Sequence, residues 1–483
     1  MTGSAGDYDV VVLGAGIAGL NALAVASEYV GREGRVLLVD RRPGPGGMWN
    51  DTYAYVRLHQ PHRFFTAGDI RWTQGRHPEH LASKGEVLEH LQHCLDVVAG
   101  RTRLDTRFGS EYVSHLERGD LVDVTLRDAD GTTSTLAARR LVKAFGYDIH
   151  ANPPLSLSSD RVRSISPDEQ DVRTGPIAQD SAPVWVVGGG KTGMDTALAL
   201  VTEQPGRHVR MLVGGGTAFT VREKMFPTGV HRWIAGSRTN QWVSDFSSRF
   251  DGTNEAEAMA WFLRHGGHSP VDAPRDYEFG IMGREEAATI RAGVVEFVRD
   301  YLEDVQDTAV GPELKLRSGA TRPVEDGTWL VNCTGYLARH DRPYEPFVSP
   351  SGRVLTISDR SATTHLTSFA GYFLTHAMMR DRLPLADLYE VDLVELRQKA
   401  KPAMGITGLT LTMHNTGVLF DVLPKSVFVR CGLDFDRWYP TPRALGGAVR
   451  FMVTHRRVVA RQRRALDALR ERGVRSGPLA QHA

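Results

Sequence analysis

Two glycine-rich hexapeptides have the spacing that most clearly fits a chemical task. Residues 14–19 (GAGIAG) and 188–193 (GGGKTG) both follow the pattern Gly-x-Gly-x-x-Gly. In such a turn the first glycine permits the tight bend, the second lets the backbone approach a pyrophosphate, and the third lets a helix pack closely on a strand. The helix that follows adds partial positive charge at its first amides. Each hexapeptide is therefore expected to hold a dinucleotide, through Gly14, Gly16 and Gly19 in the first and Gly188, Gly190 and Gly193 in the second.

The first hexapeptide lies inside a predicted strand–helix–strand unit. The apolar run Asp9–Leu13 leads into Gly14, and helical spacing follows from Ile17 to Tyr29. A second apolar run, Arg35–Val39, ends at Asp40. Short runs of this kind are typical of parallel strands that are buried on both faces. A carboxylate at the position of Asp40 can accept hydrogen bonds from the hydroxyl groups of an adenosine ribose.

The second hexapeptide has the same context and a different ending. A strand at Pro183–Val187, a helix at Met194–Thr202 and a strand at His208–Val213 are predicted. The last strand runs into glycines 214–216, so no carboxylate stands where it would repel a 2′-phosphate. This ending favours NADPH over NADH. The cations expected to contact the phosphates are Lys191 and Arg222, ahead of Arg210.

The cysteines exclude dithiol chemistry. Cys94, Cys333 and Cys431 are scattered and form no Cys-x-x-Cys pair. With two dinucleotide sites and no dithiol, hydride would enter from the nicotinamide and pass to a flavin, so the first site is assigned to FAD. Electrons would then leave to oxygen or to an organic acceptor. The histidines at 59, 62 and 77 lack metal-ligand spacing, and no metal is predicted.

Several motifs resemble those of one enzyme family. Residues 43–49 (PGPGGMW) look like the Gly-Gly-x-Trp segment of class B flavin-dependent monooxygenases, the family of the N- and S-oxygenating, Baeyer–Villiger and YUCCA enzymes. Thr52-Tyr53 and residues 57–61 (RLHQP) are similar to a YUCCA stretch, and Ser83-Lys84 resembles the start of the family's next helix. Residues 191–195 (KTGMD) and 332–336 (NCTGY) resemble its Asn-Ser-Gly-x-Asp/Glu and Ala-Thr-Gly-Tyr motifs. The resemblance covers roughly residues 8–376.

The resemblance implies a function and a set of site residues. NADPH would reduce FAD, oxygen would add at the flavin C4a, and the resulting C4a-(hydro)peroxyflavin would oxygenate a small amine, sulfide, ketone or 2-oxo acid. His59 and Gln60 would donate hydrogen bonds near the flavin, and Arg57 would hold a carboxylate or a phosphate. A structural role for His59 stays open. The implied FAD contacts are Gly14, Gly16, Gly19, Asp40, Arg41, Gly47, Met48, Trp49 and His59; those of the nicotinamide fold are Gly188, Gly190, Lys191, Thr192, Gly193 and Arg222, with Thr334 and Gly335 where the chain returns to the FAD fold.

Two other functions stay open. The family's Phe-x-Gly-x-x-x-His signature is missing before Pro183, where residues 160–164 read DRVRS. An NAD(P)H-dependent flavoprotein reductase or dehydrogenase that does not oxygenate is therefore one alternative. A non-catalytic binding protein stabilised by FAD is the other.

The predicted fold is α/β, with two Rossmann-like, doubly wound dinucleotide-binding domains, a helical insert and a helical C-terminal tail. The FAD domain is placed at 1–175 plus 320–400, the NAD(P)H domain at 176–319 and the tail at 401–483. The insert at about 217–300 is a candidate substrate lid or a surface elaboration. With 58 basic and 57 acidic residues, nucleic-acid binding is not expected. The absence of a signal peptide or apolar span predicts a cytoplasmic protein without membrane contact; the partners are a small substrate and O₂, and a homodimer stays open.

Overall fold

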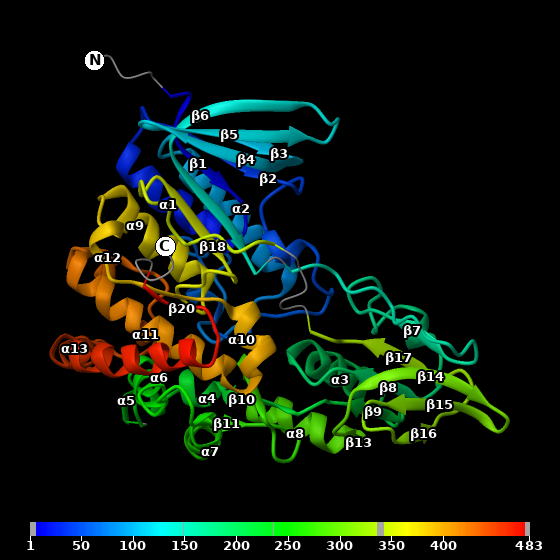
Figure 1. The fold of residues 1–483 in the computed structure, drawn as a ribbon. Coiled ribbons are helices and arrows are strands. Elements are labelled where there is room, and N and C mark those ends of the chain that lie inside the picture. The colour runs from blue at the N-terminus through cyan, green and yellow to red at the C-terminus, as the bar shows by residue number, and fades with distance from the viewer. Residues whose placement is uncertain (1–5, 148, 235, 336–341, 479–483) are drawn as a thin grey trace.

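The computed structural model describes residues 6–147, 149–234, 236–335 and 342–478. Its fold is mixed α/β, with two sheets of mainly parallel strands at opposite ends and helices packed between and below them (Figure 1). The predicted fold class is confirmed. Tyr336, the last residue of one predicted motif, lies outside the described residues.

The first sheet contains seven strands in the order β3-β2-β1-β6-β5-β4, with β18 beside β6. Its centre is parallel, because β1 pairs with β2 and β6 in the same direction, and Val10, Val11 and Val12 are fully buried there. Residues 128–131 (DADG), between stretches of alternating polar and apolar residues, predict a hairpin turn, and they join two antiparallel strands, β5 and β6. The strand bounds are β1 Tyr8–Leu13, β2 Arg35–Asp40, β3 Arg103–Phe108, β4 Ser110–Arg118, β5 Leu121–Asp128, β6 Thr133–Gly146 and β18 Val354–Ser358.

Three helices pack on the first sheet: α1 (Ile17–Val30), α2 (Lys84–Ala99) and α9 (Thr367–Met379). Ser83 begins α2 with a capping box shared with Glu86. α1 and α9 cross at very short range, because a Cβ added to Gly371 would lie 2.2 Å from the carbonyl oxygen of Ala18. This crossing brings the N-terminus of α9 next to the N-terminus of α1.

The second sheet has five parallel strands in the order β13-β9-β8-β17-β7. Helices α3 and α8 pack together beside it, and an antiparallel sheet of β14, β15 and β16 follows β13. The bounds are β7 Arg163–Ile165, β8 Val184–Val187, α3 Lys191–Glu203, β9 Val209–Leu212, α8 Arg284–Gly293, β13 Val294–Val298, β14 Leu302–Thr308, β15 Gly311–Leu316, β16 Thr321–Pro323 and β17 Trp329–Asn332.

Two local expectations from sequence are wrong. A helix over residues 285–305 is expected from its apolar spacing, yet the helix ends at Gly293 and β13 follows directly. Val294 and Val298 are β-branched and pair beside β9, and this parallel pairing outweighs helical periodicity. Residues 152–180 are rich in Pro, Ser and Asp and are expected to form a linker, yet they contain β7, an edge strand of the second sheet. The domain boundaries remain a prediction.

The insert and the C-terminal region pack against each other below the first sheet (Figure 1). Apolar spacing over residues 450–472 predicts a basic helix, and the structure confirms it as the end of α13, which packs on α11 and α6. Among helices of the described residues, none is both long and apolar enough to cross a membrane. The remaining bounds are β10 Thr217–Val221, α4 Arg222–Met225, α5 His231–Ile234, α6 Thr239–Ser247, α7 Glu255–His265, β11 Gly267–His268, β12 Asp276–Met282, β19 Tyr389–Val391, α10 Leu393–Ala400, α11 Met404–Val422, α12 Lys425–Arg430, α13 Thr441–Glu471 and β20 Ser476–Pro478.

The α1–α9 crossing predicts the effect of one substitution. Gly371→Val would force the two helices apart, and overpacking of this kind costs about 1–3 kcal/mol of unfolding free energy. Denaturant unfolding measures this loss. Gly85→Ala in α2 is the matched control, because its Cβ would meet nothing within 4 Å and alanine favours a helix. Equal stability of the Gly371→Val variant and the wild type would contradict the described crossing.

Candidate active site

One large cavity, of about 1790 Å³, joins the first nucleotide fold to the insert and the C-terminal helices. Its lining includes Gly14 and Asp40 from the first fold, Trp242 from α6, and Thr412 and Phe451 from α11 and α13. A pocket for a single small ligand usually measures roughly 300–1,000 Å³. The cavity therefore has room for a cofactor and a second molecule.

The two glycine turns are built on the same steric plan. A Cβ on Gly14 would lie 2.5 Å from the carbonyl oxygen of Ala144, and one on Gly188 would lie 2.2 Å from that of Cys333. Both glycines have left-handed φ angles, +101° and +131°. A Cβ on Gly193 would lie 2.0 Å from the carbonyl oxygen of Gly188, and Gly19 stands in the same relation to Gly14, at 1.7 Å. Neither turn admits a side chain at these four positions.

The helices that leave these turns have open N-termini. Gly16 and Gly190 are their N-cap residues, with nearly identical backbone angles of −81°/−175° and −79°/−172°. Neither helix has a side-chain cap or an acidic residue in its first turn, so the first amides are left for another acceptor. This arrangement fits the pyrophosphate of a dinucleotide at each turn.

Asp40 organises the end of the first fold. One of its carboxylate oxygens accepts the N–H of Ala15 at 2.6 Å, and the other accepts the N–H of Arg42 at 2.8 Å. Asp40 and Arg41 both line the cavity. The position fits the adenosine ribose predicted from the sequence, since each carboxylate oxygen has a further lone pair.

The Gly-Gly-x-Trp segment closes over the first turn. Gly46 donates its N–H to the carbonyl of Ala15 at 3.0 Å, and Gly47 lies against Gly16 backbone to backbone. Met48 and Trp49 line the cavity beside them; Met48 is 39% exposed, and the buried Trp49 packs edge-on against Phe65.

The loop after Trp49 docks on the second fold. The hydroxyl of Tyr53 donates to Asp195 on α3 at 2.8 Å, and that of Tyr55 shares a 2.7 Å hydrogen bond with Thr196. Asp195 also forms an ion pair with Lys191. The loop therefore joins the FAD fold to the first turn of the other nucleotide helix.

His59 lies where this loop meets the insert. Its Nδ1 accepts the N–H of Ile281 at 3.2 Å, and its carbonyl accepts from Arg222 at 2.9 Å. Burial, with the nearby cations of Lys191 and Arg222, lowers the pKa of His59 to about 3. The ring is therefore neutral, and because Nδ1 accepts, Nε2 carries the hydrogen. His59 and Gln60 line the cavity.

Arg57 lies apart from the other predicted catalytic residues. Its side chain is exposed, donates to the carbonyl of Leu81 at 3.4 Å and is not among the residues that line the cavity. We therefore give Arg57 no role in the proposed mechanism.

The residues predicted for the nicotinamide lie along α3 and its neighbours, outside the cavity lining. Lys191 is paired with Asp195, and the guanidinium of Arg222 is held by both carboxylate oxygens of Glu286 at 2.9 Å. Thr334 lies beside Gly188, whose Cβ would be 3.2 Å from its nitrogen. The structure thus brings Lys191 and Arg222 close to His59, with carboxylates already bound to both. The other predicted residues of this group, Thr192 and Gly335, lie at the start of α3 and after β17.

Comparison with known proteins places this geometry in a family. Residues 8–235, just under half of the chain, match the model of the pyridine nucleotide-disulphide oxidoreductases. This part of the chain, which contains both glycine turns, is therefore similar to the pyridine nucleotide-dependent oxidoreductases. The similarity agrees with the cofactors predicted from the sequence, FAD and NADPH.

Curated relatives of this chain include mycobacterial proteins. Uncharacterized proteins of Mycobacterium tuberculosis and Mycobacterium bovis are 30% identical over 212 residues, which cover 40% of this chain and 36% of each relative. The chain thus spans about a third of the length of these relatives.

Among solved structures, Tmm from Pelagibacter sp. strain HTCC7211 is 12% identical with a TM-score of 0.51, covering 89% of this chain and 90% of its own. The ornithine N-hydroxylase of Kutzneria sp. 744 is 16% identical with a TM-score of 0.48, covering 81% and 99%. An identity this low shows a similar fold and nothing more. This fold agrees with the resemblance to class B flavin-dependent monooxygenases that the sequence motifs indicate.

The structure also shows candidate site residues that sequence reasoning missed. Two exposed arginines contact the glycines that follow β9. The side chain of Arg299 donates to the carbonyl of Gly215 at 3.2 Å, and the backbone N–H of Arg275 lies within hydrogen-bond distance of the carbonyls of Gly215 and Gly216. Arg299 comes directly after β13, the parallel neighbour of β9, so the two strand ends meet at one edge. Had β13 been predicted as a strand parallel to β9, Arg299 could have been placed beside the end of β9 from the sequence. On the cavity wall, His365 and Thr412 were missed because nothing local marks them.

The shared plan of the two turns predicts two separable defects. Gly14→Ala forces a left-handed alanine against Ala144, and strain of about 1–3 kcal/mol should lower the FAD content of the purified protein by roughly tenfold. Gly188→Ala should leave FAD bound and weaken NADPH binding to a similar extent. Flavin absorbance and NADPH titration measure the two effects. Gly44→Ala, whose Cβ meets nothing within 4 Å, is the control. Loss of FAD from both variants would contradict the expectation that the two turns bind their cofactors independently.

Proposed function

We propose that this flavoprotein is an FAD- and NADPH-dependent monooxygenase that oxygenates a small organic molecule. The observation that carries the proposal is the single cavity, which begins at the FAD turn and continues into a chamber lined by the insert and by α11 and α13. Its volume exceeds that of a pocket for one small ligand.

The chain's own residues would bind, orient and shield. FAD, when bound and reduced by NADPH, supplies electrons for reaction with dioxygen. Gly14, Gly16 and Asp40 would hold its adenosine diphosphate part, and Trp49 would pack beside the ring system. The aromatic and aliphatic walls exclude water, which protects reactive species from hydrolysis. His59 would offer its Nε2–H to an oxygen atom that gains negative charge, and its low pKa keeps it neutral over the working range.

Thiol-disulphide chemistry is disfavoured by the cysteines. All three are free and buried, and burial raises the pKa of Cys333 and of Cys431 to about 12. A protonated, buried thiol is a poor nucleophile. A reductase that passes electrons to a small acceptor is the competing function.

The reaction of the reduced holoenzyme with oxygen tests the proposal. Rapid mixing with oxygen should give a transient whose absorbance differs from both oxidised and reduced FAD, and His59→Leu should shorten its lifetime and raise hydrogen peroxide release. Gln60→Leu, one position along the loop, is the matched comparison. Direct return to oxidised FAD in the wild type, without a transient, would favour the reductase.

We propose further that the 2′-phosphate of NADPH binds at Arg299 rather than at Lys191 or Arg222. Arg299 is exposed at the end of β9, whereas the other two are already paired with carboxylates. A charge-assisted hydrogen bond is worth about 1.5–3 kcal/mol.

Removal of this arginine should therefore change cofactor preference. Arg299→Ala is expected to raise the KM for NADPH by at least about tenfold and to leave that for NADH unchanged. Steady-state flavin reduction with each nucleotide measures the split. Arg322→Ala on β16, another exposed arginine of this region, should change neither value. An equal effect of Arg299→Ala on both nucleotides would contradict the assignment.

A further inference from the structure

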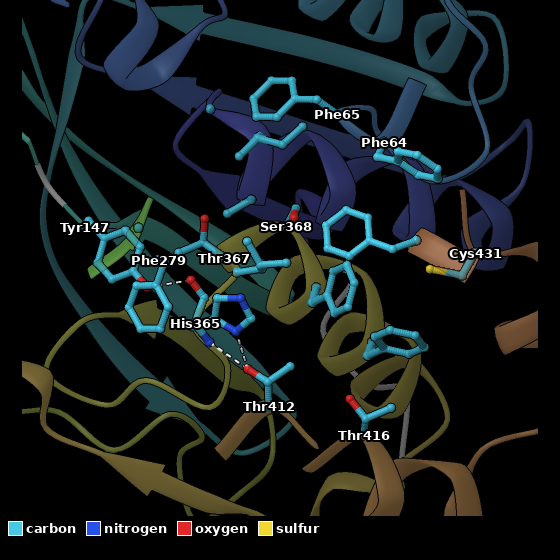
Figure 2. Close-up of a pocket in the computed structure, with 18 of the residues that line it drawn as sticks. Phe64, Phe65, Tyr147, Phe279, His365, Thr367, Ser368, Thr412, Thr416 and Cys431 are labelled. Carbon is cyan, nitrogen blue, oxygen red and sulfur yellow. Dashed lines mark hydrogen bonds between the residues drawn. The ribbon is translucent and has the colours of Figure 1, made fainter. Parts of the chain in front are cut away.

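The part of the cavity beyond the FAD turn is an aromatic chamber between α9, α11 and α12 (Figure 2). Phe369, Phe373, Phe428 and Phe420 form a continuous series along it, with centroid separations of 6.0, 4.9 and 5.1 Å. The polar side chains beside this wall include His365, Thr367, Ser368, Thr412 and Thr416. In an apolar pocket such groups fix the orientation of the ligand.

His365 is the polar group whose hydrogen-bonding state the structure defines. Its backbone N–H and its ring Nδ1 both lie within reach of the Thr412 hydroxyl oxygen, at 2.9 and 2.7 Å. That hydroxyl donates its own hydrogen to the carbonyl of Gly408 at 2.9 Å. A hydroxyl has one hydrogen, so towards His365 it can only accept. Nδ1 must therefore carry the ring hydrogen.

This leaves Nε2 of His365 with its lone pair. Within the described residues Nε2 has no protein partner, and Figure 2 shows it on the side of the ring away from Thr412. Burial lowers the pKa of His365 to about 3, so the ring stays neutral and Nε2 stays an acceptor. His365 lines the cavity.

Neighbouring residues hold the His365 ring in place, and one of them has a strained backbone. Phe279 stacks on His365 with centroids 4.9 Å apart, and the hydroxyl of Tyr147 donates to the His365 carbonyl at 2.6 Å. Phe279 has a left-handed φ of +62°, which is strained for a phenylalanine. Gly408 makes room for it, since a Cβ there would lie 2.4 Å from the Phe279 ring. Strained residues of this kind concentrate at ligand sites.

We propose that Nε2 of His365 accepts a hydrogen bond from an O–H or N–H group of an apolar, ring-sized substrate bound in the aromatic chamber. The inference rests on the proposed function, which supplies the small organic substrate. It makes His365 a substrate-orienting residue and narrows the substrate to molecules that combine an apolar body with one hydrogen-bond donor. A buried acceptor left without a partner discriminates against analogues that lack the donor.

A pair of probes that differ by one donor tests the proposal. The oxidised FAD holoenzyme, without NADPH, is titrated with indole and with N-methylindole, and binding is followed by equilibrium dialysis. The ratio of the dissociation constant of N-methylindole to that of indole should fall by about three- to tenfold in His365→Phe. This change corresponds to the loss of one ordinary hydrogen bond. Thr412→Val, which removes the group that fixes the tautomer, should lower the ratio in the same direction.

Thr416→Val is the matched control. Thr416 lines the same chamber one helical turn further along α11, and its replacement should leave the ratio unchanged. Three outcomes would overturn the proposal: an unchanged ratio in His365→Phe, no binding of either probe to the wild type, or altered FAD absorbance in His365→Phe without any probe, which would place His365 on the cofactor. Because the titration needs neither NADPH nor oxygen, a failure of the proposed oxygenation leaves it unaffected.

Discussion

The contact between the third and the first glycine of each turn determines much of the rest of the structure. Gly19 lies against the carbonyl of Gly14, and Gly193 against that of Gly188, so closely that no Cβ fits. Each helix can therefore begin directly at the end of its strand. No side chain caps the first amides of α1 and α3, so these amides are open to an external acceptor. An anionic cofactor at each turn would supply that acceptor.

The loop after Trp49 connects the two nucleotide folds to each other and to the insert. Through Tyr53 and Tyr55 it is attached to α3, and through His59 it contacts the insert. Lys191 and Arg222 are paired with Asp195 and Glu286 at this junction. Burial, together with these nearby cations, lowers the pKa of His59 and keeps its ring neutral. Two of the neutral histidines that line the cavity, His59 and His365, have opposite tautomers. His59 offers a hydrogen, and His365 offers a lone pair.

The features that could be predicted from the sequence are those whose residues lie close together along the chain. The glycine turns, Asp40 and the strands around them depend on residues within one strand–helix–strand unit, and their patterns are visible in a single stretch. Arg299 was missed because β13 resembles the continuation of a helix until its pairing with β9 is known. His365 was missed because Thr412 and Phe279 lie 47 and 86 positions away, and only the fold brings them together. The carboxylate that pairs with Arg222 was missed for a similar reason, because Glu286 is 64 residues away.

The central claim is that the two nucleotide sites serve one electron path. Anaerobic mixing of the FAD-bound protein with NADPH tests it most directly. The account predicts that the absorbance of oxidised FAD is lost in a reaction that saturates with NADPH, and that Gly188→Ala slows this loss while FAD stays bound. FAD that remains oxidised in the presence of saturating NADPH would contradict the account.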